Sequence, residues 1–341
     1  MKGKNKYWQS VRGICILAVI AIHCPNAINF EGIEQDVWLF LREIFNYPVA
    51  IFIFMDGYFT NIDKVSLDTK GYILGRVKRL FIPYIFWSLL YSIINIIIEE
   101  RSIKSIVIAL IIGKAATPFY YIIVLMQLTF ITPMLINIIK SHLHIQKILW
   151  LLSPLYLLYL YVWNYIEKSQ PPLYATLFPA WFIFYFWGLN VKYRYSIQFP
   201  NKRASIKFIY VMGAFLFQFI ETLGLLKLGY DINFAISQIR LGGFAYSMMI
   251  IMYLLSHDTK TVSNKILSCM SYLGDKSYSL FYLHCLVILF WETMIDMCNI
   301  NYGWLIQFTI CFIGTIICSL MLIVLEERLR TYINKRKCRV I

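Results

Sequence analysis

Residues 9 to 25 of the chain read QSVRGICILAVIAIHCP. An apolar run starts directly after Arg12 and reaches His23, eleven residues further along. At about 1.5 Å per helical residue this separation is about 16 Å, roughly half of a hydrocarbon core some 30 Å thick. The stretch therefore predicts a membrane helix with a cation at one mouth and an imidazole near the bilayer midplane.

Similar apolar runs recur along the whole chain. Hydrophobic residues make up 60% of the 341 residues and charged residues only 15%, a balance that excludes an ordinary soluble domain. The sequence predicts an all-α polytopic membrane protein, with a single membrane-embedded domain over residues 1–341. We expect ten transmembrane helices, at about residues 12–30, 47–62, 79–98, 118–139, 148–164, 176–191, 206–225, 235–256, 277–295 and 304–325.

The net charge of +14 is explained by this topology. With the N-terminus inside, most of the 32 Lys and Arg residues fall in cytoplasmic segments, so both termini are predicted to be cytoplasmic. Residues 1–11 and 326–341 then form short basic cytoplasmic tails. The charge needs no nucleic acid, and we expect the partner to be the lipid bilayer of the cell membrane, a bacterial plasma membrane.

The eight cysteines carry no metal pattern, since no CxxC pair occurs. Cys15, Cys285, Cys311 and Cys318 lie inside apolar runs, so we interpret them as small buried hydrophobic residues. No metal site is expected.

Titratable side chains at membrane depth are the candidate functional groups, because each costs about 2.5 to 3.5 kcal/mol to insert. His23 and His284 each suit proton transfer with a hydroxyl or thioester, or else are core histidines bonded to a neighbouring helix. Asp56 either orients a histidine or pairs with an arginine. Glu221 and Arg240 form either a buried ion pair or two walls of an outward-facing cavity.

A basic cluster lies at the cytoplasmic mouth of the third predicted span, in GRVKRLFIPYIFWS at residues 75 to 88. It contains Arg76, Lys78 and Arg79. The positive-inside bias alone predicts such a cluster. Together with Arg12 it is also a candidate pocket for a phosphate-bearing ligand, because a guanidinium grips phosphate with two hydrogen bonds.

Four stretches together resemble the acyltransferase-3 family of integral-membrane acyltransferases. They are RGICILAVIAIH at 12–23, DGY at 56–58, RVKRLFIPYIFW at 76–87 and LGDKSYSLFYLH at 273–284. The family usually has Ser where this chain has Asp56, so no role is carried over to that position.

The resemblance implies ten helices, acyl-CoA bound from the cytoplasm and transfer to a hydroxyl of a cell-surface or lipid-linked carbohydrate. It implies His23 as a general base or a transient acyl carrier. Acetyl-CoA is expected as a donor substrate rather than a permanently bound cofactor, and the sequence does not indicate the oligomeric state. The predicted site residues are the catalytic His23, Asp56 and His284, the CoA-binding Arg12, Arg76 and Arg79, and the substrate-binding Glu221 and Arg240.

Two alternatives remain open. A saccharide exporter, a flippase or a proton-coupled transporter would also place ionisable residues in its spans, with His23 and Asp56 as proton relays. The cytoplasmic arginines distinguish an acyltransferase from such a transporter, because a CoA site requires them and a carrier of neutral sugars does not. A family member that has lost catalysis and serves assembly is the other alternative.

For the oxyanion of acyl transfer, the candidate donors are a protonated His284, Tyr58 and Tyr278.

Overall fold

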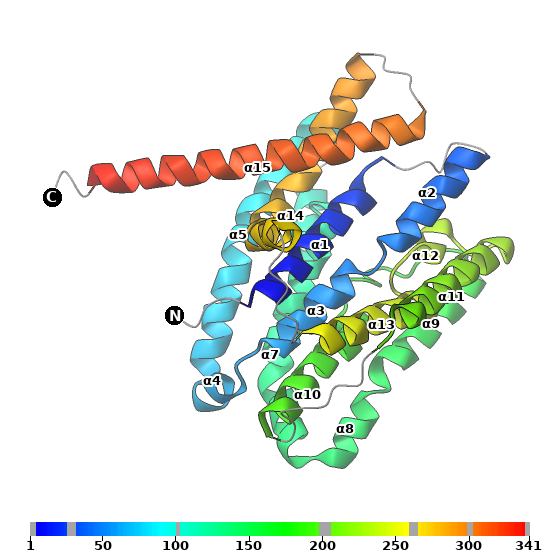
Figure 1. Ribbon diagram of the computed structural model, residues 1–341, viewed down its shortest axis with the longest axis vertical. Coiled ribbons are helices and arrows are strands. Elements are labelled where there is room, and N and C mark those ends of the chain that lie inside the picture. The colour runs from blue at the N-terminus through cyan, green and yellow to red at the C-terminus, as the bar shows by residue number, and fades with distance from the viewer. Residues whose placement is uncertain are drawn as a thin grey trace. The chain divides into compact units, whose positions relative to one another are not determined.

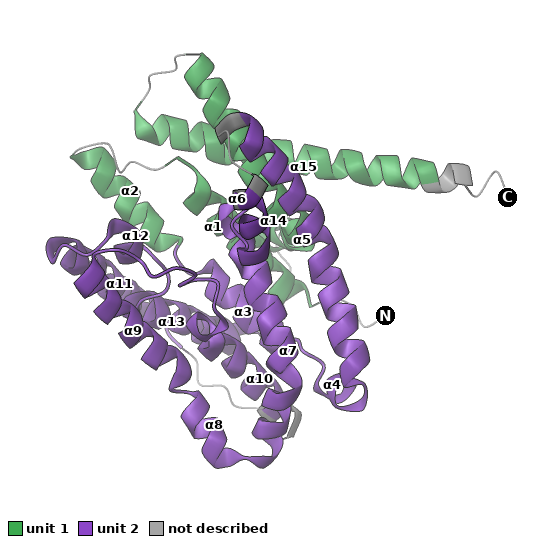
Figure 2. Cartoon of the chain, turned by 180° about the vertical axis from the view of Figure 1, so that it is seen from behind, with its two compact units in different colours: residues 1–45, 260–341 green, residues 46–259 purple. Residues whose placement is uncertain are grey.

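The computed structural model describes residues 5–25, 32–99, 103–197, 206–258, 265–298 and 303–337. Every regular element in these ranges is a helix, in agreement with the predicted all-α fold. The chain forms two compact units (Figure 2). Unit 1 consists of residues 1–45 and 260–341, and unit 2 of residues 46–259.

Unit 1 takes its helices from both ends of the chain (Figure 1). Those in its described residues are α1 (Lys6–His23), α2 (Ile33–Ile44), α14 (Lys265–Met297) and α15 (Trp304–Lys337). The side chain of Asn5 caps α1 by accepting hydrogen bonds from the backbone N–H groups of Tyr7 (3.0 Å) and Trp8 (3.5 Å). At the other end Cys24 is extended, as expected for a residue before proline, and α1 stops at His23.

A pair of glycines sets the crossing between α1 and α14. A Cβ atom on Gly13 would lie 1.9 Å from the carbonyl oxygen of Met270, and one on Gly274 would lie 1.8 Å from that of Gln9. Only hydrogen fits at these positions, and small residues allow helix backbones in membranes to approach this closely. The two helices therefore run against each other with direct backbone contact.

The start of α15 is tied to the N-terminal part of unit 1. The backbone N–H of Trp304 donates to Glu34 Oε1 of α2 (3.0 Å), and its indole N–H donates to the carbonyl of Pro25 (2.7 Å). The predicted C-terminal tail begins inside this helix, because residues 326–337 continue α15.

Unit 2 holds the remaining helices, which are drawn in purple in Figure 2. They are α3 (Pro48–Tyr58), α4 (Ile62–Leu67), α5 (Thr69–Glu99), α6 (Ile103–Ile112), η1 (Thr117–Phe119), α7 (Tyr120–Ser141), α8 (Leu143–Leu149), α9 (Leu152–Glu167), η2 (Phe178–Ala180), α10 (Phe182–Ile197), α11 (Phe208–Lys227), α12 (Ile232–Ala235) and α13 (Leu241–His257).

Glycines also set the crossing of α3 and α10. A Cβ atom on Gly57 would lie 2.3 Å from the carbonyl oxygen of Tyr185, and one on Gly188 would lie 2.3 Å from that of Phe54. The glycine of the DGY element thus serves close helix packing. As a result, the neighbouring Asp56 is held at a tightly packed position.

Seven helices in the described residues are long and apolar enough to cross a membrane. These segments overlap seven of the ten predicted spans, and the first of them contains both α2 and α3. They are Ile33–Tyr58, Thr69–Ile97, Thr117–Ser141, Leu143–Glu167, Phe208–Lys227, Lys265–Met297 and Trp304–Ile333. The protein is therefore an all-α, multi-pass membrane protein.

The other three predicted spans, 12–30, 176–191 and 235–256, overlap α1, α10 and α13. α10 has 16 residues and α13 has 17, and the first turns of α1 are polar. Residues 26–30 of the first predicted span lie outside the described part of the chain. The count of ten, the cytoplasmic termini and the single domain stay predictions.

Candidate active site

The histidines His23 and His284 face each other within unit 1. His23 is the last residue of α1, and His284 lies within α14. Their ring centroids are 5.3 Å apart, and the ring planes are inclined by 47°. His284 is fully buried and His23 is partly buried. Two imidazoles at this separation can take up and return protons at a single reaction centre.

The hydrogen bonds of His284 define its tautomer. Its Nδ1 lies 3.0 Å from the carbonyl oxygen of Leu280. A carbonyl oxygen only accepts, so Nδ1 carries the ring proton and Nε2 carries the lone pair. Nε2 in turn lies 3.3 Å from the thiol sulfur of Cys285, the next residue in the helix.

Arg42 of α2 brings a positive charge to the same end of α1. Its Nη1 donates to the carbonyl of Ile22 (2.6 Å), the residue before His23. The guanidinium lies within electrostatic reach of the His23 imidazole. It thereby binds one of the last carbonyls of α1, where cations are favoured.

Arg12 lies near the other end of α1 and is partly buried. Its Nη1 donates to Gln9 Oε1 (3.2 Å), and the Gln9 amide donates to Asp275 Oδ1 of α14 (3.1 Å). Gln9 is thus a bridge between the guanidinium and the carboxylate of the LGDKSY stretch. This chain of hydrogen bonds orients the Arg12 side chain.

In unit 2, Asp56 forms an ion pair with Arg76, between Oδ2 and Nη2. Their side chains are only 22% and 12% exposed, so the pair is largely removed from solvent. The guanidinium also lies 5.8 Å from the ring centroid of Tyr72, within range of a cation–π interaction. Of the two roles left open for Asp56, pairing with an arginine is the one observed.

The three predicted CoA-binding arginines are divided between the two units. Arg12 belongs to unit 1, and Arg76 and Arg79 belong to unit 2. Arg79 is exposed on α5, in contrast to the largely buried Arg76. Their binding of CoA phosphates stays a prediction, as do the catalytic roles of His23, His284 and Asp56.

Glu221 of α11 and Arg240 form a buried ion pair, one of the two arrangements expected. Arg240 Nη1 donates to Glu221 Oε2 (2.8 Å), and that oxygen also accepts from the backbone N–H of Gly242 (2.8 Å). The other carboxylate oxygen accepts from the hydroxyl of Tyr161. The same hydroxyl accepts from the backbone N–H of Leu241 (3.0 Å).

This network satisfies two of the orphan N–H groups at the start of α13, those of Leu241 and Gly242, with groups from α9 and α11. Arg240 is fully buried, and its side chain also donates to the carbonyls of Ser237 and Gln218 (both 2.9 Å). The pair thus joins the start of α13 to α11 through hydrogen-bonded charges. Substrate binding by Glu221 and Arg240 stays a prediction.

The two tyrosines considered as oxyanion donors are engaged with protein groups. The Tyr58 hydroxyl lies 3.5 Å from Asp258 Oδ2, and the Tyr278 hydroxyl lies 3.4 Å from that of Tyr282. Tyr278 shares unit 1 with the two histidines, whereas Tyr58 lies in unit 2.

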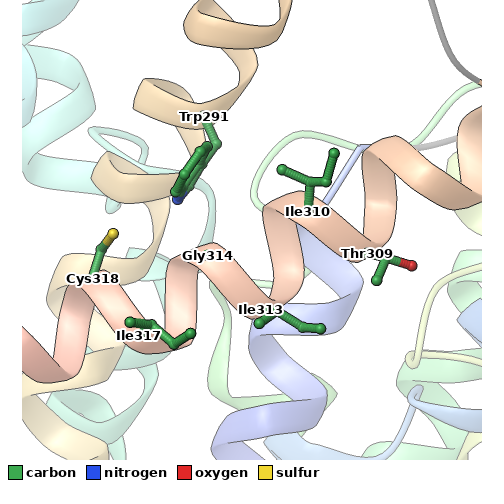
Figure 3. Close-up of a pocket in the computed structure, with 7 residues that line it drawn as sticks. All are labelled: Trp291, Thr309, Ile310, Ile313, Gly314, Ile317 and Cys318. Atoms are coloured by element: carbon green, nitrogen blue, oxygen red, sulfur yellow. The ribbon is translucent and has the colours of Figure 1, made fainter. Parts of the chain in front are cut away.

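A pocket of about 430 Å³ lies between α14 and α15 in unit 1 (Figure 3). Trp291 of α14 points toward α15 in the close-up, and a Cβ atom on Gly314 would lie 2.5 Å from its ring carbon Cε2. The lining is almost entirely apolar and includes none of the predicted site residues. It consists of Trp291, Thr309, Ile310, Ile313, Gly314, Ile317 and Cys318.

Three functional groups were not predicted from the sequence: Cys285 and Arg42 beside the histidine pair, and Gln9 beside Arg12. Cys285 was interpreted as a small apolar residue, although its adjacency to His284 was a usable signal. Arg42 and Gln9 gave no signal, because their contacts depend on which helices pack together. Within the described residues, no group of three or more His, Cys, Asp or Glu side chains is arranged to hold a metal ion.

Curated relatives of the chain are staphylococcal proteins. A Staphylococcus aureus (strain MRSA252) protein named "Probable poly-beta-1,6-N-acetyl-D-glucosamine export protein" is 27% identical over 200 residues, which cover 54% of this chain and 56% of that protein. A Staphylococcus epidermidis protein of the same name is 27% identical over 222 residues, 60% of either chain. The chain thus spans less than two thirds of the length of these relatives. No solved structure matches it significantly.

The family comparison covers far more of the chain. The acyltransferase-3 family model, described as "Acyltransferase domain", matches residues 5–324 and so extends over both units. It includes the paired histidines, the Arg12 bridge and the Asp56–Arg76 pair. With a match over nearly its whole length, the chain belongs to the acyltransferase-3 family of membrane acyltransferases.

Proposed function

We propose that the protein is a membrane O-acyltransferase that transfers an acyl group, most simply acetyl, from acyl-CoA to a hydroxyl of a cell-surface or lipid-linked carbohydrate. The observation that carries this proposal is the His23–His284 pair, with ring centroids 5.3 Å apart, in a chain of an acyltransferase family. The pair offers a base and a second imidazole where an acceptor proton must be removed.

In the net reaction, an imidazole of the pair takes the proton of the acceptor hydroxyl. The hydroxyl oxygen forms a bond to the acyl carbon, and the bond between that carbon and the CoA sulfur breaks. The CoA sulfur leaves with a proton, and the sugar keeps the acyl group as an ester. We assign to Arg42, whose Nη1 donates to the carbonyl of Ile22 next to His23 (2.6 Å), the stabilisation of the negative charge that develops on the carbonyl oxygen.

The donor is proposed to enter from the cytoplasmic side of a bacterial plasma membrane, the side on which both termini are predicted. Arg12, Arg76 and Arg79 then hold the CoA phosphates. The bridge from Asp275 through Gln9 supports this role for Arg12, because the Gln9 amide orients the guanidinium near the predicted cytoplasmic end of α1. Arg76 differs, because Asp56 already compensates its charge.

A carbohydrate acceptor is supported by the names of the relatives, which refer to poly-beta-1,6-N-acetyl-D-glucosamine. The same names support the second candidate function, saccharide export. In that case His23 and Asp56 are proton relays instead of participants in acyl transfer.

The deciding experiment uses purified protein in liposomes with cell-envelope carbohydrate and acetyl-CoA labelled in the acetyl group. We expect CoA release together with label on the carbohydrate. The variant His23→Ala should lower the rate by about 10²- to 10⁴-fold, the usual contribution of general acid–base catalysis. The matched control His144→Ala alters an exposed histidine of α8 and should leave the rate unchanged.

Two outcomes would contradict the proposal, one for the role of His23 and one for acyl transfer itself. Wild-type turnover in His23→Ala would remove His23 from the mechanism. Transport of saccharide across the vesicle membrane without any acyl transfer would establish the exporter alternative.

A further inference from the structure

The thiol of Cys285 is a nucleophile that the reaction above does not use. Its sulfur lies 3.3 Å from Nε2 of His284, the ring nitrogen that carries the lone pair. The thiol proton is therefore donated to Nε2. Only deprotonated sulfur attacks a carbonyl carbon, so a reactive cysteine needs a base in contact with its proton. His284 is such a base.

Other cysteines of unit 1 have different surroundings. Cys24 and Cys311 belong to a buried apolar cluster with Ile20, Ile288 and Ile295. Cys269 and Cys298 are exposed. Cys285 is half-buried, and its sulfur lies 3.3 Å from an imidazole nitrogen that can act as its base.

We propose that Cys285 carries the acyl group as a thioester between donor and acceptor, with His284 as its base. This inference rests on the proposed function and deepens it by dividing the transfer into two steps. In the first step the Cys285 proton moves to His284 Nε2, and the sulfur forms a bond to the acyl carbon of acyl-CoA. The bond from that carbon to the CoA sulfur breaks, and the CoA thiolate takes the proton from Nε2 to leave as free CoA.

In the second step the acceptor hydroxyl attacks the acyl carbon of the Cys285 thioester. His23, whose ring faces that of His284, takes the hydroxyl proton as the bond between the acyl carbon and the Cys285 sulfur breaks. The departing thiolate then takes this proton back through His284 Nε2, which restores the thiol and both neutral imidazoles. The first step exchanges one thioester for another of similar energy, so the acyl group stays activated. Donor and acceptor therefore need not occupy the site at the same time.

The test is isotope exchange in the absence of any acceptor, with full-length protein, unlabelled acetyl-CoA and labelled free CoA. A covalent acyl-protein makes the first step reversible, so label should appear in acetyl-CoA. Direct transfer to the acceptor gives no exchange. Accumulation of the intermediate is not required for this readout.

Three variants complete the experiment. Cys285→Ala should reduce both exchange and carbohydrate acylation by at least roughly 100-fold, as removal of a nucleophile does. Cys285→Ser, which keeps the shape of the side chain, should accept the acyl group as an oxygen ester and stall. Cys269→Ala, an exposed cysteine of the same helix, should match the wild type. Thermal unfolding of each variant verifies its fold.

The outcomes distinguish failure of the Cys285 carrier role from failure of the proposed acyltransferase function. Wild-type protein that acylates carbohydrate without exchanging CoA would overturn the carrier role and leave the proposed function intact. The same holds if Cys285→Ala retains exchange. Wild-type protein with neither exchange nor acylation would overturn both.

Discussion

Gly13 of α1 and Gly274 of α14 form a reciprocal contact: a Cβ atom on either residue would lie 3.2 Å from the backbone nitrogen of the other. Arg12 and His23 both belong to α1, whereas His284 and Asp275 belong to α14. The crossing therefore sets the alignment of the histidine pair and of the Arg12 bridge. Four predictions follow from this and the other contacts described above.

Substitution of Gly274 by Ala should separate α1 from α14. The new methyl group would overlap the carbonyl oxygen of Gln9, and overpacking of this kind costs about 1 to 3 kcal/mol of unfolding free energy. Acylation should fall as well, because the histidine rings lose their alignment. The control is Gly213→Ala in α11, where nothing lies within 4 Å and a gain of roughly 0.5 to 1 kcal/mol is expected. Chemical or thermal unfolding in detergent measures both. Equal stability of the two variants would contradict the packing argument.

Arg12→Ala should weaken acyl-CoA binding even with the acceptor absent. A hydrogen bond to a charged group contributes roughly 1.5 to 3 kcal/mol, which corresponds to a loss of affinity of about ten- to a hundred-fold. Gln9→Leu should give a smaller loss, because it removes the bridge and keeps the guanidinium. Calorimetric titration with acetyl-CoA measures the dissociation constant. Arg330→Ala, in an exposed ion pair of α15, should have no effect. An unchanged affinity of Arg12→Ala would assign that residue a structural role.

Asp56→Ser places at this position the residue that the family usually has. The variant removes the partner of Arg76, so the protein without ligand should be less stable. If Arg76 binds a CoA phosphate, the released guanidinium should raise acetyl-CoA affinity by roughly tenfold. Thermal unfolding with and without acetyl-CoA measures the two effects together. Lower stability with unchanged affinity would remove Arg76 from the donor site.

Arg240→Met should destabilise the protein strongly, because it leaves the Glu221 carboxylate without its cation. Breaking a buried pair in this way costs about 3 to 5 kcal/mol. The double variant Glu221→Leu/Arg240→Met should recover part of this loss, since no charge remains. A combined measurement of stability and of the acceptor KM separates the two roles of the pair. A raised KM at unchanged stability would instead support substrate binding.

The local sequence was sufficient to predict features that lie along one helix. The spacing of Arg12 and His23 predicts that both occupy a single helix, and α1 contains both. The apolar runs predicted seven helices that are long and apolar enough to span a membrane. The remaining three predicted spans contain shorter or more polar helices, whose membrane crossing depends on neighbours that hydropathy does not describe.

Contacts between helices could not be predicted from the local sequence. Gln9 and Asp275 are 266 positions apart, and their hydrogen bond exists only because α1 packs on α14. Likewise, the sequence indicated that Asp56 needs a partner but not that Arg76 provides it. Arg42 was missed because its function depends on the end of α1, which the prediction placed seven residues beyond His23.

The Asp56–Arg76 pair also has a consequence for insertion of the protein into the membrane. Asp56 lies near the end of one candidate span and Arg76 near the start of the next, twenty positions further along the chain. When only the first of these spans has left the translocon, its carboxylate has no counter-ion in the lipid. Lateral release is therefore most favourable for α3 and α5 together, as a hairpin whose charges are already compensated.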